Sequence, residues 1–175
     1  FIDLDESLGR LGMDAQVVEG VGSWIQLRQV LQGDGWSNIK TIIIDTITRA
    51  EEMALAHTLL TVKTEKGGTA DGIESYGFGK GYVHMFDTFM GLLVDLDRHA
   101  RAGRNIILIA HDCTTMVPNP AGEDWLRFEP RLQSPNSGKN SIRLRIREWA
   151  DHCLFIGYDV EAKDKKGKGQ GTRTL

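Results

Sequence analysis

The run Thr41-Ile42-Ile43-Ile44-Asp45-Thr46 constrains the fold more than any other part of the sequence. Its three consecutive isoleucines leave no polar face, which is typical of a strand buried on both sides at the centre of a parallel sheet. The run ends at the carboxylate of Asp45 and the hydroxyl of Thr46. Ligands of open α/β sheets lie beyond such strand ends, where an acid can hold Mg²⁺ beside nucleotide phosphates. An acid there can equally cap the next helix, so this run alone leaves both interpretations open.

Two further predicted strands also end in polar residues. Residues 1–4 lead to Asp5 and Glu6, and the apolar run 105–110, predicted to be buried on both faces, leads to His111 and Asp112. Because the carboxyl ends of parallel strands share one edge of a sheet, we expect these groups to converge with Asp45. Two plainer alternatives stay open: the acids could be ordinary solvated residues, and His111 could be a buried core histidine.

A zinc site is a weaker alternative. It would combine His111 and Cys113 with His152 and Cys153. The last two residues are adjacent, so in a strand they would point to opposite faces, and the usual ligand spacing is missing. The sequence therefore disfavours zinc.

Composition indicates one ordinary globular domain. The chain has 175 residues, 41% of them apolar and 26% charged, with a formal net charge of -3. That charge gives no global attraction to nucleic acid, so any basic surface must be local. Two cysteines suggest a reducing compartment, and no apolar run is long enough to span a membrane. We expect a cytoplasmic protein with no membrane contact.

The remaining elements follow from periodicity and from Gly and Pro positions. Ser23 is a candidate N-cap for the first predicted helix. Helices are predicted over 24–31, 48–61, 82–102 and 141–150, although the last also fits a strand, and further strands over 14–21 and 151–156. The glycine-rich segment 63–81 and the segment 114–140, which holds all four prolines, are predicted to be long irregular loops. Residues 161–175 are expected to form a hairpin tip or a loose end.

The order of these elements resembles the RecA family over nearly the whole chain. Residues 1–7 resemble the strand whose terminal acid activates water, residues 41–46 the Walker B strand, and residues 105–112 the strand that senses the γ-phosphate. The element Tyr-Gly-x-Gly-Lys-Gly-Tyr at 76–82 and the strand ending in His111 are similar to those of phage-type RecA-like ATPases. That group is associated with single-strand annealing and recombination.

The resemblance implies an α/β fold, a RecA-like P-loop NTPase core with a mostly parallel sheet flanked by helices, as a single domain over 1–175. It implies ATP and Mg²⁺ as cofactors. Asp45 would hold Mg²⁺ through water, with Thr46 beside the nucleotide. Asp5 or Glu6 would orient the attacking water, and His111 would sense the γ-phosphate. The implied partners are single-stranded DNA and further copies of the chain in a ring or filament.

One departure from the family is the missing Walker A motif. The segment Gly77-Phe78-Gly79-Lys80-Gly81 has a lysine among glycines. It lacks the four-residue spacing, the Ser or Thr after the lysine, and a preceding strand. We therefore expect the domain to be N-terminally incomplete, with its phosphate loop upstream of Phe1, and residues 1–175 alone not to bind ATP at micromolar concentration.

The two long loops correspond to the DNA-facing segments of RecA-like proteins. The second contains aromatic and basic residues of the kind that stack on bases and bind phosphates: Trp125, Arg127, Phe128, Arg131 and Lys139. Acids at 123, 124 and 129 also allow a solvated loop with ordinary charge pairing. Two other functions stay open: a catalytically inactive binding module, and a helicase or regulatory ATPase of the same fold.

Overall fold

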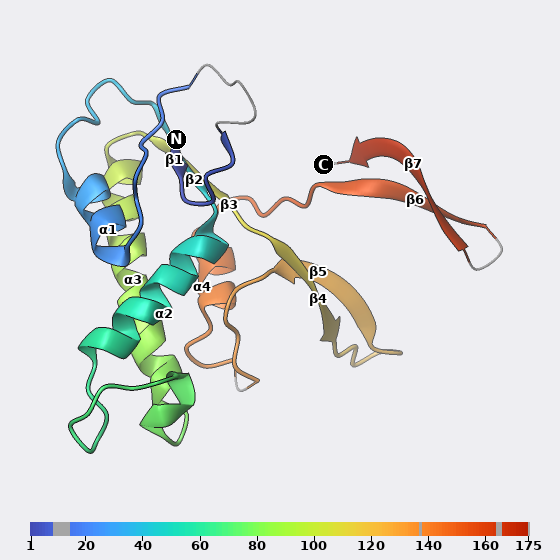
Figure 1. Ribbon diagram of the computed structural model, residues 1–175. Coiled ribbons are helices and arrows are strands. Elements are labelled where there is room, and N and C mark those ends of the chain that lie inside the picture. Colours follow the sequence, from blue (N-terminus) through green and yellow to red (C-terminus); the bar gives the residue numbers. More distant parts are fainter. Residues whose placement is uncertain (9–14, 137, 164–165, 175) are drawn as a thin grey trace.

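A three-stranded parallel sheet forms the centre of the computed structural model, which describes residues 1–8, 15–136, 138–163 and 166–174 (Figure 1). Its strands are β1 (Ile2–Asp3), β2 (Thr41–Asp45) and β3 (Asn105–Ile109), in the order β1-β2-β3. Ile44 of β2 lies between Ile2 and Leu108 of its neighbours. The prediction that residues 41–46 form the central strand is confirmed for this sheet.

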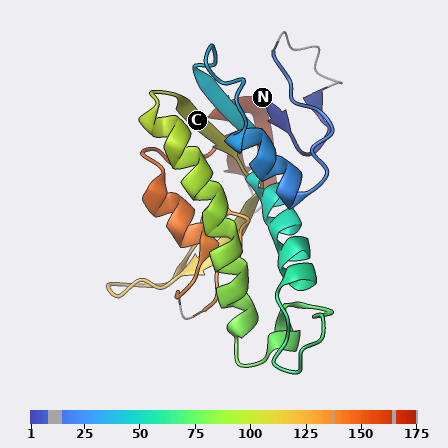
Figure 2. The ribbon, with the colours of Figure 1, turned by 90° about the vertical axis from the view of Figure 1, so that its left-hand side faces the viewer.

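The described residues form four α-helices, α1 (Trp24–Gln32), α2 (Ile47–Thr61), α3 (Lys80–Arg101) and α4 (Ile142–Trp149), and the short 3-10 helix η2 (Ile73–Tyr76) precedes α3. Helices α1 and α3 lie over one face of the sheet, whereas α4 lies beyond the carboxyl ends of its strands (Figures 1 and 2). The side chains of Ser23, Thr46 and Ser141 cap the first backbone amides of α1, α2 and α4. These caps satisfy amides that have no partner within the helix.

The core lies between this helical layer and the sheet. Ile42 and Ile44 of β2 are fully buried, as are Leu27 of α1 and Phe89 of α3. The rings of Trp24 and Phe89 stack with their centroids 6.0 Å apart. Each such side chain contributes about 1.5–3 kcal/mol by leaving water.

The prediction that β2 and β3 are buried on both faces is wrong. Ile43 is only partly buried, and Ile107 and Ile109 of β3 are 46% and 38% exposed. The cause is that the described helices pack against one face of the sheet only. The other face carries isoleucines that the described part of the chain does not cover.

The segment predicted as an irregular loop over 114–140 contains an antiparallel hairpin. Its strands are β4 (Asp112–Val117) and β5 (Trp125–Pro130), with Thr115 opposite Arg127. Two of the prolines lie in the connection, and Pro130 is the last residue of β5. The prolines therefore lie at the ends of the strands, where they do not prevent strand formation.

The strand predicted over 151–156 is also wrong. These residues form no regular element, and Leu154 and Ile156 are exposed. They lead to β6 (Gly157–Lys163) and β7 (Lys166–Thr174), a second antiparallel hairpin that projects from the body (Figure 1). Of the strand predicted over 14–21, only a single bridge between Val18 and Ile2 forms, and residues 9–14 lie outside the described part.

None of the helices in the described ranges has both the length and the apolar character needed to cross a membrane.

Candidate functional site

Side chains from all three strand ends meet at the carboxyl edge of the sheet. The hydroxyl of Thr46 donates a hydrogen bond to Asp5 Oδ2 (3.0 Å). His111 Nε2 lies 3.5 Å from the same oxygen. Thr46 also accepts a hydrogen bond from the backbone amide of Arg49 (3.1 Å), which fixes it at the start of α2. The convergence predicted for Asp5, Thr46 and His111 is therefore present.

Asp45 lies beside this group in an electronegative environment. Burial, followed by the negative charges of Asp5 and Asp3, raises the pKa of Asp45 above its usual value. The hydroxyl of Ser7 donates to its carboxylate (3.4 Å). The Asp45–Thr46 peptide bond is cis. Excess negative charge at this edge favours a cation there.

Of the two acids after β1, Asp5 is the one joined to the cluster. Glu6 is exposed and has a positive φ of 53°. Asp3 was not predicted as part of the site; its carboxylate accepts the backbone amides of Ser7 and Leu8 at 3.1 and 2.9 Å. It thereby shapes the turn that presents Asp5. An acid inside a short strand gives no sequence signal for this role.

His111 is not a core residue, because its side chain is 53% exposed. Its backbone amide donates to the hydroxyl of Thr48 (3.1 Å), and its carbonyl accepts from the amide of Arg131 (2.8 Å). The first contact ties it to the start of α2, and the second ties it to the end of the β4–β5 hairpin. His111 therefore lies between the acidic cluster and the hairpin.

The donor set at this edge fits Mg²⁺ better than zinc. Within the described residues, no group of three or more His, Cys, Asp and Glu side chains could hold a metal unaided, and His152 and Cys153 are exposed. Mg²⁺ needs fewer protein ligands, because one or two carboxylates serve together with water and phosphate oxygens. Asp45 and Asp5 supply such oxygens.

The glycine-rich element at 77–81 lies far from this edge. It leads into the first turn of α3, and the hydroxyl of neighbouring Tyr76 donates to the carbonyls of Thr58 and Val62 at the far end of α2. The 15 residues of α2 span about 22 Å. This position agrees with its rejection as a phosphate loop.

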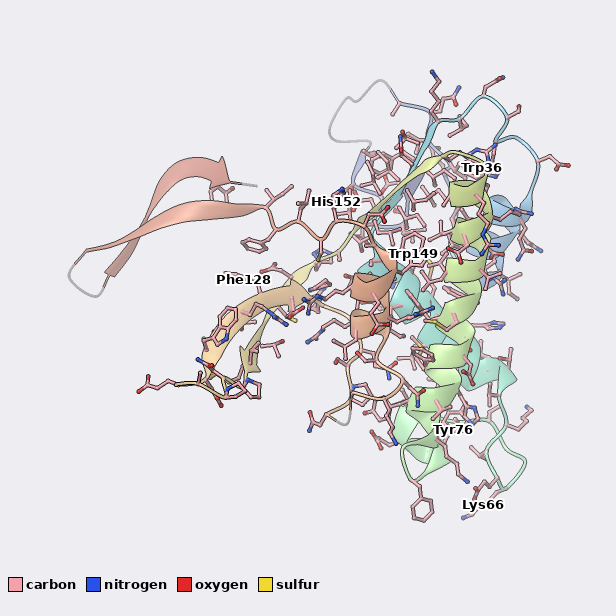
Figure 3. All side chains as sticks on the ribbon, turned by 180° about the vertical axis from the view of Figure 1, so that it is seen from behind. Trp36, Lys66, Tyr76, Phe128, Trp149 and His152 are labelled. Atoms are coloured by element: carbon pink, nitrogen blue, oxygen red, sulfur yellow. The ribbon has the colours of Figure 1, made fainter. Side chains whose placement is uncertain are left out.

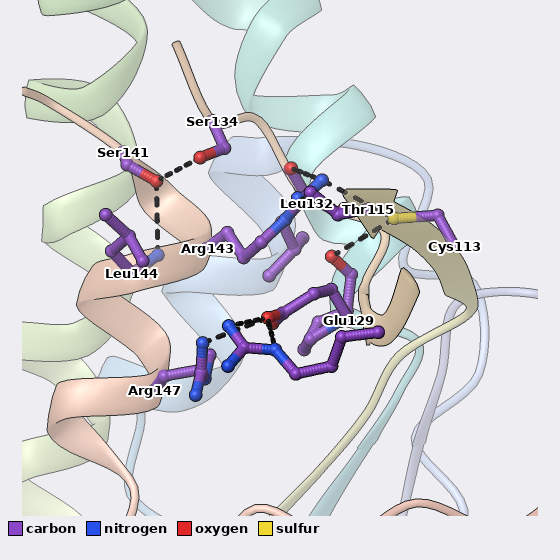
Figure 4. A network of polar contacts seen from close by, with 11 residues as sticks. Cys113, Thr115, Glu129, Leu132, Ser134, Ser141, Arg143, Leu144 and Arg147 are labelled. Atoms are coloured by element: carbon purple, nitrogen blue, oxygen red, sulfur yellow. Dashed lines mark hydrogen bonds and ion pairs between the residues drawn. The ribbon is translucent and has the colours of Figure 1, made fainter. Parts of the chain in front are cut away.

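The hairpin places Arg127 inward, toward α4. Arg127 and Arg147 both form ion pairs with Glu129, whose side chain is only 4% exposed (Figure 4). The guanidinium of Arg127 also lies over the ring of Trp125, 5.8 Å from its centroid. Arg127 is thus held by an acid inside the protein, although it shares that single carboxylate with Arg147.

The other predicted nucleic-acid residues are distributed over different surfaces. Phe128 alternates with Arg127 and faces outward, where it stacks on Phe155 with centroids 4.3 Å apart. Arg131 is exposed at the end of the hairpin, and Lys139 lies in the segment before α4. Phe128 therefore does not share a face with Trp125 and Arg127.

Comparison with known proteins identifies the family. The family model described as AAA domain matches residues 1–175. The searches of curated proteins and of solved structures found no significant match. The parallel sheet of the α/β structure fits a P-loop NTPase fold. We conclude that the chain belongs to the AAA domain family of P-loop ATPases.

Proposed function

We propose that this domain supplies the metal-holding and water-orienting residues of a RecA-like ATPase that acts on single-stranded DNA in phage recombination or annealing. Membership of the family implies a nucleotide and usually Mg²⁺. The observation that carries the proposal is the contact of Thr46 and His111 with one oxygen of Asp5, beside Asp45.

Each residue has a distinct role in this proposal. Bound Mg²⁺ would offset charge on the phosphates, and Asp45 would hold it through water. Asp5, oriented by the Thr46 hydroxyl, would accept a hydrogen bond from the attacking water. His111 would donate from its exposed ring to the γ-phosphate.

Contact with DNA is assigned to the outer side of the β4–β5 hairpin. The chain connection supports this, because the hairpin begins directly after His111 and Arg131 returns to its carbonyl. The face of the Phe128 ring that does not stack on Phe155 offers a surface for a base, and Arg131 offers a phosphate contact.

The test is Mg²⁺-dependent ATP hydrolysis by the full-length product of the gene. Asp45→Asn should lower kcat by about 100-fold or more, since loss of metal stabilisation amounts to several kcal/mol. Asp87→Asn, an exposed position on α3, is the matched control and should retain activity. Activity of Asp45→Asn within a few-fold of the parent would refute the metal assignment.

A second pair separates the two acids after β1. Asp5→Asn should reduce kcat strongly, whereas Glu6→Gln should not, because only Asp5 contacts Thr46 and His111. The opposite ranking would assign the water-orienting role to Glu6.

A further inference from the structure

The first turns of α2 hold both ends of the β4–β5 hairpin. The hydroxyl of Thr48 accepts a hydrogen bond from the amide of His111, which directly precedes β4 (3.1 Å). The carboxylate of Glu51 accepts one from the amide of Gln133, shortly after the end of β5 (2.7 Å). Residues spaced as Thr48 and Glu51 are lie on the same face of a helix. In Figure 3 the hairpin, marked by Phe128, extends away from the helices, so its position is set near this root.

The segment that follows β5 connects Glu51 to the backbone of His111. The amide of Arg131 donates to the carbonyl of His111 (2.8 Å). Leu132 is buried in the core, and its carbonyl accepts a hydrogen bond from the guanidinium of Arg143 (3.0 Å). The backbone position of His111 therefore depends on a carboxylate that lies in another element.

Docking of this segment carries two costs. Burial raises the pKa of Glu51 to about 7, which the hydrogen bond from Gln133 and the charge of Arg143 oppose and the charge of Glu52 reinforces. The side-chain amide of Gln133 is buried, and neither its nitrogen nor its oxygen has a hydrogen-bond partner among the described residues. Buried polar groups without partners cost free energy. These costs bring the docked and undocked positions of the hairpin closer in free energy, as a two-state element requires.

Helix α2 also begins at the acidic edge of the sheet. Its N-cap, Thr46, directly follows Asp45 and donates to Asp5. Glu51 lies about 8 Å further along the helix axis. A change in the first turns of α2 can therefore reach the hairpin at its exit, through Glu51, as well as at its entry.

We propose that Glu51 is a positioning residue that keeps the exit of the hairpin docked on α2 and so determines how strongly single-stranded DNA stimulates the ATPase. This inference rests on the proposed ATPase function. It assigns Glu51 no contact with nucleotide or DNA, because its carboxylate acts through the backbone of Gln133.

The experiment measures ATP hydrolysis by the full-length product of the gene, with and without a single-stranded oligonucleotide. Glu51→Leu keeps most of the side-chain volume but removes the acceptor for the Gln133 amide. Its kcat and KM without DNA should be unchanged, whereas stimulation by DNA should fall about tenfold, the factor that corresponds to one lost buried hydrogen bond.

Two further variants separate the hydrogen bond from the packing. Glu51→Gln keeps an oxygen acceptor and should restore the stimulation of the unaltered protein. Glu52→Leu is the matched control, because the neighbouring Glu52 is exposed and pairs with Arg49 on the surface of α2. It should retain full stimulation.

Hydrogen exchange without nucleotide separates undocking of the hairpin from unfolding. Glu51→Leu should speed exchange about tenfold in residues 130–134, which lose the contact with α2. Exchange in α3, whose core residues pack elsewhere, should not change. Faster exchange throughout α3 together with lost basal activity would show that Glu51 supports the whole fold, and would overturn the proposal.

The remaining outcomes distinguish this inference from the proposed function. If the unaltered protein hydrolyses no ATP, the proposed function is wrong and this inference falls with it. If the unaltered protein is active but not stimulated by DNA, or if Glu51→Leu keeps full stimulation, only the role of Glu51 is refuted. Failure of Glu51→Gln to restore stimulation would also refute it, because the acceptor would then not be the feature that matters.

Discussion

At the scale of single residues, Glu51 is a titratable group close to neutral pH. It lies on α2, and its carboxylate accepts a hydrogen bond from the backbone amide of Gln133 (2.7 Å). Burial raises the pKa of Glu51 to about 7, although the Gln133 hydrogen bond and the charge of Arg143 act in the opposite direction. The folded protein therefore holds a proton there that the unfolded chain releases near pH 4.5.

We predict that Glu51 makes the fold less stable as the pH rises from about 4.5 to 7. Over this range the unfolded state loses the proton first, so the free energy of unfolding should fall by about 3 kcal/mol. Glu51→Gln keeps an acceptor for the Gln133 amide but cannot ionise, so it should remove this part of the slope. Urea titrations at several pH values measure the free energy of unfolding. If its dependence on pH were the same in Glu51→Gln as in the unaltered protein, the prediction would be contradicted.

Asp45 should show a conflict between stability and activity. Its raised pKa comes from burial and from the charges of Asp5 and Asp3, so the ionised form destabilises the fold without a bound cation. At pH 7 and without Mg²⁺, Asp45→Asn should raise Tm by a few degrees relative to Asp87→Asn. Calorimetry measures this difference, and a lower Tm for Asp45→Asn would mean that Asp45 has a structural role.

The sequence sufficed to predict the residues at the carboxyl ends of the parallel strands. Asp5, Asp45, Thr46 and His111 all lie at or just after such ends, and parallel pairing brings them to one edge. It did not predict Glu51, whose partner is 82 positions away in the chain. That contact depends on how the segment before α4 packs against α2, which no local pattern encodes.

At the scale of elements, charge pairs dock the β4–β5 hairpin onto α4. Glu129 is buried between Arg127 and Arg147, and Arg143 donates to the hydroxyl of Thr115 (3.0 Å) and to the carbonyl of Leu132 (3.0 Å). Removing one partner of a buried pair leaves charge uncompensated, which costs more than losing an exposed pair.

Two arginines of the hairpin should therefore differ in their effects. Arg127→Ala should lower the free energy of unfolding by about 1–3 kcal/mol, because Glu129 keeps only one of its two cationic partners. Exposed Arg131→Ala should leave stability unchanged, weaken binding to single-stranded DNA and reduce the salt slope by about 0.7. Urea unfolding measures the stability of each variant, and DNA binding at several salt concentrations measures its affinity and salt slope. If Arg127→Ala lost DNA affinity and Arg131→Ala kept it, the assignment of the DNA contact to Arg131 would be wrong.

The same hairpin shows why sequence patterns misjudged some elements. Cys113, Thr115 and Val117 alternate with exposed neighbours, but the prolines within the connection and at the end of β5 obscured the strands. In contrast, the apolar residues 154–156 resemble a buried strand and remain exposed. Apolar character predicts a strand only where the fold supplies a neighbour to pair with it, and that depends on tertiary structure.

At the scale of the whole molecule, His111 connects the acidic edge to the hairpin. Its ring lies 3.5 Å from Asp5, its amide donates to Thr48 at the start of α2, and its carbonyl accepts from Arg131. A change at the ring can therefore act on the backbone that carries the hairpin. Coupling of this kind requires that the ligand interact differently with the two states of the linking element.

We predict that His111→Ala in the full-length product of the gene still binds ATP and single-stranded DNA but loses stimulation of its ATPase by DNA. The substitution removes the ring that would contact the γ-phosphate and keeps both backbone contacts, so each site persists while the link between them is lost. His152→Ala, an exposed position after α4, is the matched control. ATPase rate against oligonucleotide concentration measures the coupling. If DNA stimulated the His111→Ala ATPase as strongly as the unaltered ATPase, the two sites would communicate through other residues. That result would refute the linking role of the His111 ring.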